Sequence, residues 1–425
     1  MAEHNLAALL GDMGDHGGAA AACRRAFAKG GDAAETWLVH ARALQGSGAL
    51  DDAEAAYIAA IARRADYAPA HRDLAQLRWM RTGDAVAATR TIDAALAAGG
   101  APALLGIKAA VLSTAGEDAA SAGLLERAVT STPRDVALRL MAASAQARMG
   151  DPNRQLAHAA AALSADPAST AAAKAMVEAL LHAGRPAEAA ALGERIASVV
   201  PDDQGVIALL ATAWRLMDDR RAAALCDDPA LVSTCVIGPP MGWSTLEHFL
   251  AELGQALLAR HQWRTHPLEQ SVRHGSQTQE DLARSELPVF RALFAALDAP
   301  IRAHIAALGK GGDPLRRRIS GGYRIAGAWS VLLQPGGFHT DHVHPQGWLS
   351  SAFYVALPDA VTRGPEGWLA LGRPGIPTRP ALKATRHVEP RVGQLVLFPS
   401  YLWHGTEPFA GDEPRMTVAF DIVPT

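Results

Sequence analysis

The chain has 425 residues, 49% of them hydrophobic, so it is too long for one ordinary core and can form two or more packed domains. Forty basic against forty-three acidic residues leave a formal net charge of −3, without a long block of either sign, which argues against nucleic acid as a partner. The three cysteines are scattered and no apolar stretch is long enough to span a membrane, so we expect no disulfide framework, no membrane partner and a cytoplasmic location.

The first half of the chain repeats with a period of about 34 residues. Turn glycines recur at spacings of 34, 35, 33, 34 and 34, namely Gly14, Gly48, Gly83, Gly116, Gly150 and Gly184. Alanine- and leucine-rich stretches flank each glycine, so each unit is predicted to be two helices joined by a tight turn. Met217-Asp218-Asp219 takes the next turn position without glycine, which is expected of a capping unit.

This period resembles the tetratricopeptide repeat. The second unit is the most similar, because its residues fall at the usual positions of that repeat: Trp37, Ala41, Leu44, Gly48, Ala53, Tyr57 and Ala60. Stacked helix pairs of this kind share one core and expose a concave groove, so we predict an all-α helical-repeat solenoid over residues 1–228. The groove is interpreted either as a site for a peptide or protein partner, or as part of a spacer or dimerisation element.

The composition changes after Asp227-Asp228-Pro229, where most of the aromatic residues and histidines appear. We predict helices at 243–260 and 279–308, and then short strands at 329–333, 351–357, 367–371, 394–398 and 416–423. Glycine and proline separate these runs, as in Gln334-Pro335-Gly336-Gly337. Residues 229–425 are therefore predicted to be an α+β domain with a double-stranded β-helix, or jelly-roll, core.

Metal-binding side chains gather in this second domain. His339, Asp341, His342 and His344 lie within six residues, His404 follows some sixty residues later, and Arg415-Met416-Thr417 opens the last strand. This order resembles the iron(II)/2-oxoglutarate oxygenase superfamily. Within it, the His-x-His-Pro motif followed by a Ser-rich strand is similar to a bacterial and phage group of these oxygenases, and His266–Thr278 resembles the upstream signature of that group. The resemblance covers roughly residues 235–425.

Two pairs of ligands fit a strand end, because residues i and i+2 project to the same side of it: His339 with Asp341, and His342 with His344. The first pair with His404 gives the more usual two histidines and one carboxylate. We favour the second, because superfamily members similar to prolyl hydroxylases place the first ligand five residues after a Gly-Gly pair. The metal set is then His342, His344 and His404, with His339 lining the pocket and Asp341 accepting a hydrogen bond from a ligand imidazole.

The resemblance implies Fe(II) as cofactor, 2-oxoglutarate and O₂ as cosubstrates, and hydroxylation of a protein, a peptide or a small molecule. Arg415 and Thr417 are expected to bind the distal carboxylate of 2-oxoglutarate. Tyr354 either contacts the cosubstrate or fills the core, and the candidates for the substrate mouth are His339, Gln270, Arg273 and Gln277. Two other functions stay open, an adaptor whose second domain is catalytically silent, and a three-histidine cupin that does not use 2-oxoglutarate, against which Arg415-x-Thr417 argues.

Overall fold

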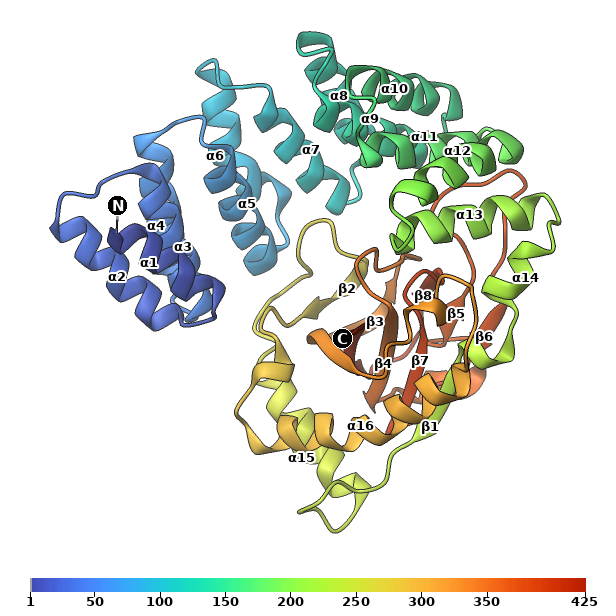
Figure 1. Ribbon diagram of the computed structural model, residues 1–425. Coiled ribbons are helices and arrows are strands. Elements are labelled where there is room, and N and C mark those ends of the chain that lie inside the picture. The colour runs from blue at the N-terminus through green and yellow to red at the C-terminus, as the bar shows by residue number, and fades with distance from the viewer. Residues whose placement is uncertain (1) are drawn as a thin grey trace. The chain divides into compact units, whose positions relative to one another are not determined.

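A computed structural model describes residues 2–425, and residues 2–226 form a run of helices that are coloured blue to green in Figure 1. The helices pair as predicted, with one pair to each repeat. Their bounds are α1 (Ala2–Asp12), α2 (His16–Ala28), α3 (Ala34–Gly46), α4 (Leu50–Arg63), α5 (Ala68–Thr82), α6 (Ala85–Ala97), α7 (Ala103–Thr114), α8 (Asp118–Ser131), α9 (Val136–Arg148), α10 (Pro152–Ala165), α11 (Thr170–His182), α12 (Pro186–Val199), α13 (Gln204–Leu216) and α14 (Arg221–Cys226).

The turns between paired helices explain the periodic glycines. Each of the six turn glycines has a positive φ, between 69° and 85°, which a residue without a Cβ adopts without strain. Aspartate follows several of these glycines because its side chain accepts hydrogen bonds from the first amides of the next helix, as Asp84 and Asp151 do. At the seventh turn, Asp218 takes φ 54° in place of a glycine.

The chain divides into two compact units. Unit 1 holds the residues up to Ala145 together with Pro267–Glu269, and unit 2 holds Gln146–His266 and Gln270–Thr425. The helices from α10 to α14 therefore belong to the same unit as the sheets. The predicted domain boundary at residue 228 stays a prediction.

The second half of the chain is built on two antiparallel sheets. The six-stranded sheet has the order β1-β7-β4-β9-β3-β2, and the three-stranded sheet has the order β6-β5-β8. The bounds are β1 (Ser233–Val236), β2 (Val272–Gln277), β3 (Tyr323–His339), β4 (Leu349–Ala356), β5 (Leu369–Leu371), β6 (Arg386–Val388), β7 (Gln394–Pro399), β8 (His404–Thr406) and β9 (Arg415–Pro424). The helical repeats followed by a sheet-rich domain agree with the predicted fold class, and the jelly-roll connection itself stays a prediction.

Two of the predicted elements have different bounds in the structure, and strands β1, β2, β6 and β8 were not predicted. The helix predicted at 279–308 begins only at Pro288, as α16 (Pro288–Leu308), and a short 3-10 helix at Leu282–Arg284 precedes it. Strand β3 runs through Gln334-Pro335-Gly336-Gly337, which we had interpreted as a turn. Its partner β2 pairs Arg273 with Phe338 and Gly275 with Leu333, so the four residues are an insertion within the strand rather than its end.

One core joins the large sheet to a helix that precedes it in the sequence and to two helices that lie between its strands. Apolar side chains of β4, β7 and β9 pack with α15 (Leu246–Leu258), α16 and helix α13 of the repeats, which contributes Ile207, Ala208 and Ala211. Helix α13 thus packs in two directions, because Val206, Leu209 and Leu210 lie in a second core with α11 and α12.

No helix within residues 2–425 is both long and apolar enough to cross a membrane.

Candidate metal centre

Backbone pairing brings the predicted metal ligands together. His342 lies just after β3 and His404 begins β8, and the two residues form an isolated antiparallel bridge. The amide of His342 donates to the carbonyl of His404 at 2.9 Å, and the amide of His404 donates back at 3.0 Å. The amide of His344 donates to the carbonyl of Ser400 at 3.0 Å. Segments sixty residues apart are thereby fixed to each other at the position of the three side chains.

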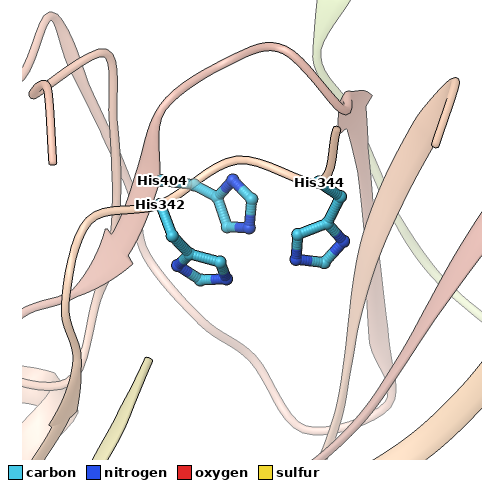
Figure 2. A group of neighbouring side chains, drawn as sticks. All are labelled: His342, His344 and His404. Atoms are coloured by element: carbon cyan, nitrogen blue, oxygen red, sulfur yellow. The ribbon is translucent and has the colours of Figure 1, made fainter. Parts of the chain in front are cut away.

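The imidazoles of His342, His344 and His404 converge. One ring nitrogen of each lies within 4.8 Å of the other two, and Figure 2 shows the three rings turned toward one another. His342 and His344 project to the same side, as residues i and i+2 of an extended segment do. Within residues 2–425 this is the group with metal-ligand geometry, and it includes neither His339 nor Asp341.

The other ring nitrogen of each histidine has its own acceptor. Nδ1 of His342 lies 2.8 Å from the carbonyl of Thr340, and Nδ1 of His404 lies 2.9 Å from the carbonyl of Leu402. A carbonyl oxygen only accepts, so both Nδ1 atoms carry the proton and both Nε2 atoms keep a free lone pair. Nδ1 of His344 lies 2.6 Å from Oδ1 of Asp421, which leaves its Nε2 for the centre in the same way.

Burial keeps the imidazoles of His342 and His404 neutral. It lowers the pKa of His342 to about 3, with the neighbouring His344 as a smaller cause. It also holds the pKa of His404 well below the ordinary value, and the two other histidines act in the same direction. A metal ion binds only the deprotonated nitrogen, so rings that are already neutral are ready to act as ligands.

Asp341 is not part of the histidine group and has a different partner from the one predicted. Its Oδ2 accepts from Nε of Arg373 at 2.5 Å, and Arg373 also donates to Glu407 at 2.8 Å. The acceptors of the imidazole N–H groups are two carbonyls and Asp421, so the expectation that Asp341 accepts from a ligand imidazole is wrong in this structure. Burial raises the pKa of Asp341, although Arg373 opposes this effect.

A buried cation lies on the inner side of the last strand. The side chain of Arg415 is 2% exposed, and its guanidinium carbon lies 5.0 Å from the ring centroid of Tyr354. Thr417 is buried two residues further along β9 and pairs with Tyr354 in the sheet. Within residues 2–425 no carboxylate forms an ion pair with Arg415, its Nε has no hydrogen-bond partner, and the Tyr354 hydroxyl is the polar side chain that acts on the guanidinium. A buried, unpaired guanidinium is costly unless an anion binds it.

Of the residues predicted at the substrate mouth, only some lie close to the three histidines. The ring of His339 lies 5.9 Å from the ring of His342, and its Nδ1 is 3.0 Å from Oγ of Ser271. His342 and Arg415 are both close enough to lower the pKa of His339, although burial is the larger cause. Arg273 also acts on His339, while Gln270 is exposed and Gln277 lies further along β2, opposite Val331.

Two polar residues of the site were missed in the sequence. Asp421 holds His344 and also accepts from Ser350 at 2.8 Å. It lies six residues after Arg415 on the same strand, so strict alternation along β9 would have placed it on the same face. Oγ of Ser271 lies 3.4 Å from Nε2 of His342, and no pattern in the sequence indicates this contact.

The three histidines suit iron as a ligand set, and Arg415 with Tyr354 suits 2-oxoglutarate. Three imidazoles whose Nε2 atoms converge are a suitable donor set for iron, with one negative charge fewer than the usual two histidines and a carboxylate. The guanidinium of Arg415 beside the hydroxyl of Tyr354 suits a carboxylate, which can accept hydrogen bonds from both side chains.

Comparison with known proteins gives one family match. Residues 327–421, which include all three histidines and Arg415, match the family model described as "Putative 2OG-Fe(II) oxygenase". This segment therefore carries the sequence pattern of that oxygenase family, whose cofactor is iron(II) and whose cosubstrate is 2-oxoglutarate. Among curated protein sequences, none matches the chain.

Solved structures of two kinds of protein are similar to part of the chain. A tetratricopeptide repeat protein from Parabacteroides merdae is 16% identical and matches over 45% of this chain and 76% of its own, with a TM-score of 0.37. A Pseudomonas putida prolyl-4-hydroxylase is 17% identical over 48% of this chain and 98% of its own, with a TM-score of 0.33. The collagen prolyl hydroxylase of Paramecium bursaria Chlorella virus-1, solved with 2-oxoglutarate, is 13% identical over 47% of this chain and 99% of its own, also with a TM-score of 0.33.

Proposed function

We propose that the chain is an iron(II)- and 2-oxoglutarate-dependent oxygenase that hydroxylates a protein, a peptide or a small molecule. The observation that carries the proposal is a buried Arg415, without an acidic partner within residues 2–425, in the same domain as three convergent imidazoles. A purely structural arginine at 2% exposure would be expected to have an acidic partner. The match of residues 327–421 to the oxygenase family supports the same function.

The residues have separate tasks in this proposal. His342, His344 and His404 hold the metal on one side, and leave its other side for the cosubstrate and O₂. Arg415 and Thr417 bind the distal carboxylate of 2-oxoglutarate, with Tyr354 under the guanidinium. Iron(II) with 2-oxoglutarate and O₂ supplies the chemistry that hydroxylates a C–H bond while 2-oxoglutarate is converted to succinate and CO₂. The apolar walls around Arg415 exclude water, which strengthens its attraction for the carboxylate.

The repeats are proposed to recruit the partner or substrate through their concave groove. Stacked tetratricopeptide-type repeats expose such a surface as a consequence of their packing. The alternative, a spacer or dimerisation element, predicts that a repeat-only fragment self-associates and retains no peptide.

Binding of 2-oxoglutarate tests the function directly. The iron-loaded protein under anaerobic conditions is expected to bind 2-oxoglutarate, to melt at a higher temperature with it, and to show the weak visible band of a chelated iron(II) complex. Arg415→Leu removes the guanidinium that donates to the distal carboxylate of 2-oxoglutarate. The affinity for 2-oxoglutarate should therefore fall by a factor of tens to thousands, which is a loss of binding free energy on the order of 2–5 kcal/mol. Arg415→Lys keeps the charge and should lose less. The iron content should stay the same in both variants.

The outcomes separate the alternatives. A wild-type protein that holds iron but responds to 2-oxoglutarate with neither a thermal shift nor the band is a three-histidine cupin of another activity. The ligand group contains three histidines and no carboxylate, and this observation favours the three-histidine cupin as the second candidate function. A wild-type protein that binds neither iron nor 2-oxoglutarate supports the adaptor function.

A further inference from the structure

Helix α13 of the repeats contacts the loop that carries His344. The amide of Gln204, the first residue of the helix, donates to the carbonyl of Pro345 at 3.1 Å, and Pro345 directly follows His344. The position is otherwise complete, because the side chain of Asp203 caps the helix by accepting from Val206. The first amides of a helix have no acceptor within the helix, so the Gln204 amide is available to bind the loop that carries His344.

The same helix contacts the segment that carries His404. Nε1 of Trp403, the residue before His404, donates to Oγ1 of Thr212 at 3.0 Å. Thr212 is 1% exposed and its hydroxyl donates to the carbonyl of Ala208 at 2.8 Å, so its lone pair is oriented toward the indole. A buried indole N–H without this acceptor would be unsatisfied.

A third contact connects α13 to Trp403 through the backbone. The guanidinium of Arg215 donates to the carbonyl of Gly372 and, at 3.2 Å, to the carbonyl of Lys383. The amide of Gly372 in turn donates to the carbonyl of Trp403 at 2.7 Å. Both the side chain and the backbone of Trp403 are thus fixed, directly or through one residue, to the same helix.

The packing agrees with the hydrogen bonds. Trp403 packs against the core of the large sheet and also against the core of α11, α12 and α13. Gly375 lies against its ring, where an added Cβ would be 3.1 Å from Cζ3. The ring is therefore held from several sides, and a change in α13 would act on the residue next to His404.

We propose that α13, a helix of the repeat solenoid, is a positioning element of the metal centre. The amide of Gln204 at its N-terminus fixes the position of the loop that carries His344, and the hydroxyl of Thr212 fixes the segment that carries His404. The affinity for metal therefore depends on a helix outside the sheets. This inference rests on the proposed function, because it takes the three histidines as the metal ligands. Gln204, Thr212 and Arg215 are positioning residues, since each acts on the histidines through a neighbour.

Gln204→Pro isolates the first contact. Proline suits the first position of a helix, where its missing N–H costs little, and Asp203 already has the extended conformation that precedes a proline, with φ −67° and ψ 110°. The one backbone hydrogen bond lost is the bond to Pro345. Gln204→Ala is the matched control, because it removes the same side chain and keeps the amide. Anaerobic titration calorimetry with iron(II) should give about tenfold weaker binding for Gln204→Pro than for Gln204→Ala, at the lower end of effects measured around metal ligands.

Thr212→Val tests the second contact, with Thr212→Ser as the conservative variant that keeps the hydroxyl. Iron(II) binding should weaken by about tenfold in Thr212→Val and return close to the wild-type value in Thr212→Ser. The visible absorption of bound cobalt(II) should also change in Thr212→Val, because the spectrum reports the geometry of the three ligands. A variant that affects only the stability of the fold would lower the melting temperature without changing this spectrum.

The result that overturns the inference is iron(II) binding by Gln204→Pro and Thr212→Val at the affinity of their controls. If Thr212→Val does not fold, the comparison of Gln204→Pro with Gln204→Ala decides alone. Failure of the proposed function looks different, because the wild-type protein then binds no metal. A wild-type protein that binds iron while all variants equal it contradicts only the role of α13.

Discussion

Asp421 orients His344 by accepting from its Nδ1 at 2.6 Å, while Ser350 donates to the same oxygen. Asp421→Ala removes the acceptor, so we expect the affinity for iron(II) to fall by about 10–100-fold. Asp421→Asn keeps an amide oxygen in the same place and should lose less. Anaerobic calorimetry measures both affinities, and an unchanged affinity in Asp421→Ala would show that the ring needs no support from this side.

The choice between the two ligand pairs is also decided by single residues. His344→Ala removes one of three ligands and should abolish tight iron binding, whereas Asp341→Ala should keep it, because Asp341 is paired with Arg373. Metal analysis of the purified variants measures the iron held per chain. Iron lost in Asp341→Ala and kept in His344→Ala would instead establish the pair of His339 and Asp341.

The sequence indicates ligands better than it indicates their supports. His342 and His344 could be paired because alternate residues project to one side, a rule that needs no knowledge of the fold. The acceptors at Thr340 and Leu402 are backbone carbonyls, and every residue has one. Ser271 reaches the site through the pairing of β2 with β3, where an insertion breaks the register, so counting along the chain does not place it.

At the scale of elements, helix α16 buries a histidine that destabilises the protein in acid. His304 is 3% exposed, and neither of its ring nitrogens has a partner within residues 2–425. Burial lowers its pKa from 6.5 to about 4. Between these values the unfolded chain binds a proton that the folded chain excludes, so the free energy of unfolding falls as the pH falls through this window. Each unit of pKa difference is worth about 1.4 kcal/mol, which gives a loss of up to about 3 kcal/mol.

His304→Leu is the test of this dependence. The apolar side chain needs no partner and does not titrate, so urea unfolding should show a smaller loss of stability from pH 7 to pH 4 than in the wild-type protein. His248→Gln is the control, because His248 is exposed on α15. Equal losses in His304→Leu and the wild type would mean that other buried groups set the acid sensitivity.

The elements themselves could be predicted where one local rule governs them. The turn glycines need a positive φ, and six of them at regular spacing marked the helix pairs correctly. Strands β1, β2, β6 and β8 were not predicted, because all four are defined by partners elsewhere in the chain, and β1, β6 and β8 have only three or four residues. Strand β3 was predicted too short at its C-terminal end, since glycine and proline indicate a turn locally, whereas the pairing of Phe338 and His339 with β2 continues the strand beyond them.

At the scale of the whole molecule, one helix of the repeats contributes buried side chains to the core of the sheets, and the sequence does not reveal this. The composition changes near residue 228, which is why the domains were predicted to meet there. Helix α13 belongs by its sequence to the repeats, yet its buried Ile207 packs in the core of the sheets. A solenoid helix has two faces that can bury apolar side chains, and the sequence alone does not say which neighbour covers each face.

Two fragments test where the sheet domain begins. Residues 201–425 keep α13 and α14, whereas residues 229–425 lose the buried side chains of Ile207 and Leu225 from the main core. Each is worth about 1.5–3 kcal/mol when fully buried, so the shorter fragment should be about 5 kcal/mol less stable and melt about 10–20 °C lower, or without cooperativity. Circular dichroism at the sheet band measures both melts. Equal melting temperatures would mean that the predicted boundary at residue 228 is also the energetic one. A lower value for residues 229–425, restored by adding back residues 201–228 to the chain, would make α13 part of the sheet domain's core.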